Sequence, residues 1–201
     1  MADPTYLDAD TGVITEGDPW VCVGSWEADN DGYATVTFTS STGQNDWSQY
    51  HSLVAVWYVR SWYSSSYDQL NAHYGQGGTA YNYSVKNQIG LNTGGNSGVF
   101  DGPNSIGWHV GYVSAASSTA NEFSGGIFEV RNHMHGTHTT VLSQTTGPCS
   151  ARVSTGVAGN YAGTTSEMDT IVFDLANGNF QQFSRIDLFG ILPKMILEGT
   201  L

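Results

Sequence analysis

Short runs in which apolar and polar residues alternate, each followed by Gly, Asn, Asp or Ser, recur along most of the chain. The clearest is ATVTFTS at 34–40, where Val36 and Phe38 occupy one set of alternate positions and three Thr residues occupy the other. A period of two predicts a strand with one buried and one solvated face. The segment EADNDGY at 27–33 supplies the Asn, Asp and Gly that are typical of a tight reversal.

Ten or eleven short strands are predicted in this way, at intervals of eight to twenty residues. Residues 91–103 are rich in glycine and are predicted to form a loop, and residues 75–78 a glycine-rich bend. The predicted strands cover 20–26, 34–40, 53–62, 68–74, 82–91, 107–112, 125–132, 137–143, 151–158, 170–175 and 184–191.

This spacing is typical of an antiparallel β-sandwich or barrel. Gly, Ser, Thr and Asn make up 79 of the 201 residues, whereas charged residues make up 12%. The residues that favour long helices are correspondingly scarce, and no strand–helix–strand alternation indicates a parallel sheet. We therefore predict an all-β fold with an N-terminal arm at 1–18, one domain at 19–192 and a C-terminal arm at 193–201.

The charge balance excludes several partners. The chain has six Lys plus Arg against eighteen Asp plus Glu, a formal charge of −12. A chain this acidic cannot neutralise a phosphate backbone, so no nucleic acid is expected as a partner. No run of eighteen apolar residues is present, so no membrane span is expected. The N-terminus, MADPTYLDAD, does not resemble a signal peptide, and synthesis in a cytosol is expected.

The two cysteines, Cys22 and Cys149, lie 127 positions apart and outside any CxxC motif. A disulfide would suit a particle that ends up outside a cell, whereas a cytosolic origin argues against one. Two free, buried thiols are the favoured interpretation, because unpaired Cys behaves as a small core hydrophobe.

The C-terminal segment LPKMILEGTL at 192–201 is apolar and follows the last predicted strand. An isolated domain gains nothing by exposing Leu192, Met195, Ile196 and Leu197 to water. We expect these four residues to be assembly contacts, packed on a neighbouring subunit or folded back over a sheet edge.

His133, His135 and His138 form the most conspicuous cluster of potential metal ligands. Three imidazoles can bind Zn²⁺ or Ni²⁺, and residues at i and i+2 lie on one face of a strand. However, no carboxylate lies within the cluster to orient an imidazole. A surface hairpin is therefore the favoured interpretation, and no metal or other cofactor is predicted.

The segment from Glu27 to Gly32, with Asp29 and Asp31, resembles the first half of a calcium loop. It lacks the bidentate Glu six positions beyond the glycine, where this chain has Phe38, and a strand follows instead of a helix. An ordinary turn is favoured.

Two pairs of carboxylates are candidates for the acid–base catalysis of glycoside hydrolysis: Glu122 with Glu129, and Glu167 with Asp169. Neither pair lies within an obvious aromatic subsite, and no GxSxG motif occurs. The sequence therefore predicts no catalytic residue and no enzyme.

The chain has 6 Trp, 11 Tyr and 8 Phe residues. Trp62, Tyr63 and Tyr67 form the best candidate platform for stacking a sugar ring, which would suit a carbohydrate-binding module. The favoured alternative is that these aromatic residues fill the core and subunit interfaces of a protein with few Leu.

The order of the motifs resembles that of small β-sandwich structural proteins of tailed bacteriophages. The resemblance covers about 20–192, and its most specific part is the closing segment from Asn179 to Ile191. The motifs that carry it are VGSWEADNDGYATVTFTS at 23–40, YHSLVAVWYV at 50–59, LNAHYG at 70–75, GGIFEVRN at 125–132 and DTIVFDLANGNFQQFSRIDLFGI at 169–191.

The resemblance implies a jelly-roll-like β-sandwich without enzymatic activity. It also implies a capsid decoration (cement) protein that assembles as a homotrimer, binds the major capsid protein and stabilises the outside of the virion shell. The alternative that it leaves open is a tail fibre or tail-associated protein that binds carbohydrate on the host surface.

The closing strands should contribute inward layers of the core. In 184–191, Ile186 and Leu188 are predicted to point to one face, and Arg185 and Asp187 to the other. The same alternation in 170–175 is predicted to bury Ile171, Phe173 and Leu175.

Overall fold

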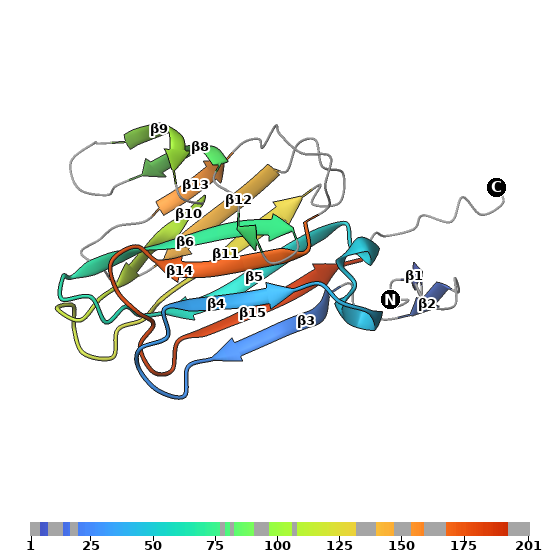
Figure 1. Ribbon diagram of the computed structural model, residues 1–201, viewed down its shortest axis with the longest axis horizontal. Helices are drawn as coiled ribbons and strands as arrows, with labels where there is room; N and C mark the ends of the chain where they lie inside the picture. Colours follow the sequence, from blue (N-terminus) through green and yellow to red (C-terminus); the bar gives the residue numbers. More distant parts are fainter. Residues whose placement is uncertain are drawn as a thin grey trace.

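In a computed structural model, the chain forms two antiparallel sheets packed against each other (Figure 1). The two short 3₁₀ helices, η1 (Gly43–Asn45) and η2 (Trp47–Gln49), connect strands at one end. Among the described residues, no helix has the length and apolarity needed to cross a bilayer. The structure describes residues 5–7, 14–16, 20–76, 79–80, 83–90, 97–105, 108–131, 140–146, 154–158 and 168–192.

The larger sheet has six strands and the smaller has five. The order in the six-stranded sheet is β13 (Ser154–Ala158), β12 (Thr140–Thr146), β11 (Ser124–Arg131), β5 (Ser52–Val59), β15 (Arg185–Ile191) and β3 (Trp20–Glu27). The order in the five-stranded sheet is β10 (Trp108–Ser114), β6 (Tyr67–Gln76), β14 (Thr170–Leu175) and β4 (Thr35–Thr39), with β7 (Thr79–Ala80) paired to β6.

The strands pair in a nested order. β3 pairs with β15, β4 with β14, β5 with β11 and β6 with β10. Successive pairs alternate between the two sheets, as if one long antiparallel hairpin were wrapped around the core. This is the connectivity of a jelly roll, and the predicted all-β, jelly-roll-like sandwich is confirmed.

Each of the eleven predicted strands has a counterpart in the structure, but the prediction of a loop at 91–103 was wrong. β9 (Ser97–Ser105) lies largely in this segment and pairs with β8 (Tyr83–Gly90). The ladder shifts register between Tyr83 and Val85, opposite the stretch that contains Pro103. A proline is tolerated at such an irregularity because no ladder hydrogen bond needs its missing N–H.

The N-terminal arm also contains a hairpin that the sequence did not indicate. β1 (Thr5–Leu7) and β2 (Ile14–Glu16) pair with each other in a separate two-stranded sheet.

The core lies between the sheets, and the predicted alternation is confirmed in β4, β14 and β15. Val36 and Phe38 are buried while the three Thr residues of β4 are exposed. Ile186 and Leu188 are fully buried, whereas Arg185 is exposed. The sheets approach closely where Phe38 lies against Gly24, because a Cβ at Gly24 would come within 2.5 Å of the Phe38 ring.

Candidate functional site

Four loops at one end of the sandwich are bonded to one another and form what we call the loop end (left in Figure 1). These loops are 28–34, 60–66, 115–123 and 176–184. The amide of Gly32 donates to the carbonyl of Phe180 (3.1 Å), and the amide of Phe180 donates to the carbonyl of Tyr33 (2.8 Å). Backbone hydrogen bonds within and between loops hold their backbones in one arrangement.

Arg60 fixes the loop at 115–123. Arg60 is only 3% exposed. Its Nη1 donates hydrogen bonds to the carbonyls of Thr119 (2.8 Å) and Glu122 (2.7 Å). Charged donors form stronger hydrogen bonds than neutral ones, so this contact favours a single loop conformation.

Asp68 fixes the neighbouring loops in the same way. This carboxylate is 1% exposed. It accepts hydrogen bonds from the Ser61 hydroxyl (2.7 Å) and the Asn177 side-chain amide (3.0 Å). A buried carboxylate requires such partners, and here they join the start of β6 to the loops that follow β5 and β14.

Three large aromatic side chains remain exposed on the loop end. Trp62 is 56% exposed, Tyr63 36% and Phe183 62%. Tyr67, the third member of the predicted platform, lies at the start of β6 and is half-buried. Its ring meets that of Tyr112 edge-on, with centroids 5.4 Å apart.

Phe183 has a backbone conformation that side chains rarely adopt, with φ of 70°. It is the third residue of a turn that the Ser184 amide closes on the carbonyl of Gln181 (3.0 Å). Gly or Asn is usual there, because positive φ costs other residues about 1–2 kcal/mol. Sequence reasoning missed this residue, since FQQFS at 180–184 has no period that marks one Phe as exposed.

The acidic turn at 28–34 uses its carboxylates to hold the loops, in keeping with the predicted ordinary turn. Asp31 accepts a hydrogen bond from the amide of Gln182 (2.7 Å). Asp29 accepts one from the Tyr33 hydroxyl (2.7 Å), and this hydrogen bond raises the pKa of Tyr33. The Asp31 carboxylate and the backbone carbonyl of Asp29 both accept hydrogen bonds from Gln182, in the turn that contains Phe183.

A second candidate surface lies on the outer face of the six-stranded sheet, the face directed away from the core. Five large apolar side chains are exposed on this face. Ile127 of β11 is opposite Val56 of β5, and the ring of Tyr58, also on β5, stacks on Phe123 at 4.7 Å. Leu142 lies on β12, opposite Glu129, and Trp20 lies on β3, opposite Ile191. We call this set the apolar stripe. It consists of Trp20 (45% exposed), Val56 (37%), Tyr58 (51%), Ile127 (45%) and Leu142 (43%).

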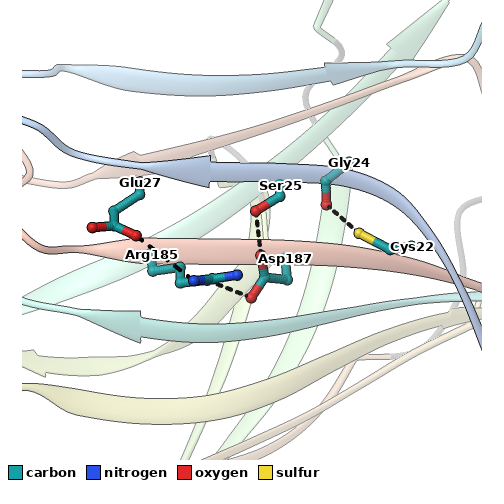
Figure 2. A network of polar contacts seen from close by, with 6 residues as sticks. All are labelled: Cys22, Gly24, Ser25, Glu27, Arg185 and Asp187. Carbon is teal, nitrogen blue, oxygen red and sulfur yellow. Dashed lines mark hydrogen bonds and ion pairs between the residues drawn. The ribbon is translucent and has the colours of Figure 1, made fainter.

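Polar groups on β15 lie beside the apolar stripe, because Asp187 is opposite Val56 and Arg185 is opposite Tyr58. Figure 2 shows the network that these groups form with β3. Arg185 contacts Asp187 through Nε at 2.7 Å and Glu27 through Nη1 at 3.7 Å. The Ser25 hydroxyl donates to the other oxygen of Asp187 (2.5 Å). The hydrogen bond to Asp187 and the two acidic neighbours raise the pKa of Arg185.

Cys22 lies on the same outer face and is exposed, so the prediction of a buried thiol is wrong for this residue, although the thiol is free as predicted. Its Sγ lies 3.5 Å from the carbonyl of Gly24 (Figure 2). The β3–β15 ladder shifts register between Leu188 and Phe189, so that Val23 points inward and Cys22 outward. Cys149 lies outside the described residues.

The outer face of the five-stranded sheet is polar. Asn71 and His73 of β6 are buried there. The Asn71 side chain donates to Oδ1 of Asp174 (3.1 Å). Nε2 of His73 lies 2.7 Å from Oδ2 of Asp174, at ion-pair distance, although the two groups are not aligned as a hydrogen bond.

Leu192 is the one described member of the predicted C-terminal contacts, and it packs partly buried against the core. Glu129, considered for catalysis, instead pairs with Arg131 at 2.7 Å. Glu122 is partly buried in the loop at 115–123, and Asp169 accepts a hydrogen bond from Thr170. His133, His135, His138, Glu167, Met195, Ile196 and Leu197 lie outside the described residues.

Within the described part of the chain, no three His, Cys, Asp or Glu side chains come together in a way that could hold a metal ion. No family model matches the chain, and no curated protein is significantly similar to it.

Proposed function

We propose that this chain is a bacteriophage virion structural protein that decorates the outside of the capsid shell and stabilises it. The observation that carries the proposal is the apolar stripe, five large apolar side chains on one sheet face that are 37% to 51% exposed. A group of exposed apolar side chains on one face of a sandwich is typical of a protein–protein contact.

The size of this face suits a contact with a partner. Five strands, about 4.8 Å apart and about seven residues long at about 3.3 Å per residue, cover roughly 550 Å². Specific interfaces bury at least about 500 Å² on each partner. The face is therefore large enough to bind a shell subunit.

The charge of the outer face also favours contact. Its outward positions on β3, β11 and β15 carry Arg131 and Arg185 against Glu27, Glu129 and Asp187, a net charge of −1. The remaining −11 of the formal −12 lies elsewhere in the chain. A nearly neutral face lets an acidic protein dock, while the acidic remainder keeps decorated particles apart.

In this proposal the chain acts mechanically and catalyses no reaction. A homotrimer, which the phage resemblance implies, would seat several apolar stripes over adjacent capsomers. The interface would add buried area that resists internal pressure, and assembly would take place in the host cytoplasm.

Immunogold labelling of intact virions with antibody against the purified chain tests this proposal. We expect labels spread over the heads. Labels confined to tails would support the tail-associated alternative. An absence of label even on permeabilised virions would overturn both the capsid and the tail proposals.

A co-sedimentation assay assigns the contact to the apolar stripe. Purified chain added to particles stripped of it should rebind, and Val56→Asp should abolish rebinding. Thr37→Asp, which places the same charge at an exposed position of the other sheet, is the matched control and should rebind. Equal rebinding of both variants would show that the apolar stripe is not the surface that contacts the shell.

A further inference from the structure

The exposed ring of Phe183 contributes little to the stability of the fold. The side chain is 62% exposed, and its backbone has φ of 70°, where glycine is the favoured residue. An aromatic residue that is both exposed and conformationally unfavourable is typical of a binding position.

The backbone around Phe183 is held on both sides. The Phe183 amide donates to the carbonyl of Ala28 (2.9 Å), and the Gln182 side-chain amide donates to the carbonyl of Asp29 (2.7 Å). A ring presented from a fixed backbone binds a ligand with little loss of conformational entropy.

Trp62 and Tyr63 project from the segment that lies alongside the one containing Phe183. The Trp62 amide donates to the carbonyl of Asn179 (2.8 Å), and the Gln181 amide donates to the carbonyl of Arg60 (3.0 Å). The two segments are therefore hydrogen-bonded neighbours, and their exposed rings share the loop end.

From these observations we infer that Trp62, Tyr63 and Phe183 form a binding site for an uncharged saccharide. The C–H face of a pyranose ring stacks on a flat aromatic ring, while its hydroxyls donate hydrogen bonds to acceptors at the rim. The neighbouring turn at 28–34 provides such groups in the exposed side chains of Asp29 and Asp31.

The same carboxylates select against anionic sugars. Gln182, next to Phe183 in the chain, binds Asp31 through its amide at 2.7 Å. An anionic saccharide would meet this carboxylate and a chain of formal charge −12, so an uncharged saccharide is favoured. The site and the apolar stripe are formed by different residues, so either can fail without the other.

Saturation-transfer difference NMR on the full chain tests this inference. The probes are lactose, maltotriose and triacetylchitotriose, which are uncharged, and sialyllactose, which is the anionic counterpart of lactose. We expect transfer to the ring C–H protons of at least one uncharged probe at millimolar concentration, and less transfer to sialyllactose than to lactose.

Three variants locate the site. Trp62→Ala and Phe183→Gly should each weaken binding of the uncharged probe by about tenfold or more, whereas Phe183→Tyr keeps a flat ring and should retain it. Phe183→Gly should leave the melting temperature unchanged or raise it, because glycine accepts positive φ, so its loss of binding is separate from unfolding.

Three results would overturn the inference. The first is no transfer to any uncharged probe by the wild-type chain. The second is binding that Trp62→Ala and Phe183→Gly both leave intact. The third is a change in oligomeric mass in these variants without any saccharide binding, which would identify the rings as a protein contact.

Discussion

The two outer faces of this sandwich differ although the same chain weaves through both sheets. On the five-stranded sheet, outward side chains such as Thr35, Asn71 and Asp174 are polar, and Asn71 and Asp174 are hydrogen-bonded to each other. On the six-stranded sheet, outward positions include Val56 and Ile127, which are 37% and 45% exposed. One face pairs polar side chains such as Asn71 and Asp174 with each other, and the other leaves apolar surface in contact with water.

This difference predicts that substitutions on the polar face mainly affect stability and that substitutions on the apolar face mainly affect assembly. Removing a partner from the polar face leaves buried polar groups without hydrogen bonds, which lowers the free energy of unfolding. Changing an exposed apolar side chain on the other face costs the isolated fold little, but it alters whatever that face binds. Substitutions on the two faces should therefore have opposite effects in stability and assembly measurements.

The largest expected effect on stability comes from placing a charged side chain at a buried position of β15. Leu188→Asp would place a charge at a position that is 1% exposed, and we expect a loss of more than about 4 kcal/mol of unfolding free energy, enough to unfold the domain. Circular dichroism during thermal unfolding measures this. Asp187→Asn, at the adjacent outward position, is the control and should remain folded. A Leu188→Asp variant that folds and assembles would contradict the assignment of Leu188 to the inward face of β15.

The next effect is on the polar face. Asp174→Ala removes the acceptor of Asn71 and the charged neighbour of His73. We expect a loss of about 1–3 kcal/mol in chemical denaturation, because two buried polar side chains lose their partner, with oligomeric mass unchanged. Thr37→Ala, exposed on the same face, should cost within about 0.5 kcal/mol. Equal losses in the two variants would show that the Asp174 contacts do not stabilise the fold.

A smaller effect on stability, with a large effect on assembly, is expected on the apolar stripe. Ile127→Lys should change the unfolding free energy by no more than about 0.5 kcal/mol, because the side chain is exposed, yet it should abolish rebinding to stripped particles. Gln144→Lys adds the same charge at the position that pairs with Ile127 on β12 and should weaken rebinding less. The interpretation fails if Ile127→Lys unfolds the domain.

The smallest effect is expected at the border of the apolar stripe. The hydrogen bond to Glu129 raises the pKa of Arg131, but the Arg131 side chain is 54% exposed. Solvent screens such an ion pair, so Arg131→Gln should leave the melting temperature unchanged within error, in low and in high salt. A fall as large as that of Asp174→Ala would mean that the exposed Arg131–Glu129 pair and the contacts of Asp174 contribute alike to stability.

The inner faces were predictable from sequence and the outer faces were not. Alternation identified Ile186 and Leu188 as buried because a period of two is a direct signal of a half-buried strand. In β5, by contrast, SLVAVWYV is apolar on both sides, so the sequence could not say that Val56 and Tyr58 face solvent. Which residues belong to the apolar stripe depends on the order of the strands in the sheet, and the alternation of apolar and polar residues gives no information about that order.

The candidate site was predicted in part. Trp62 and Tyr63 were candidates for a surface platform, although positions in the core or in subunit interfaces were favoured, and both side chains are exposed in the structure. Phe183 was missed because its exposure follows from a positive φ, and a turn of that kind normally carries Gly or Asn. Burial of Cys22 was wrongly predicted because a register shift in the β3–β15 ladder turns the side chain outward.

The nested pairing has a consequence for how the chain acquires its fold. β3 begins at Trp20, and its partner β15 ends at Ile191, so the first strand of the sandwich has no partner until almost the whole domain has left the ribosome. The innermost pair, β6 with β10, closes the shortest loop, and each outer pair closes a longer one, at growing entropic cost. Folding should therefore be post-translational and slow for a domain of this length, and a nascent chain truncated before residue 185 would leave the edges of β3 and β5 open to aggregation.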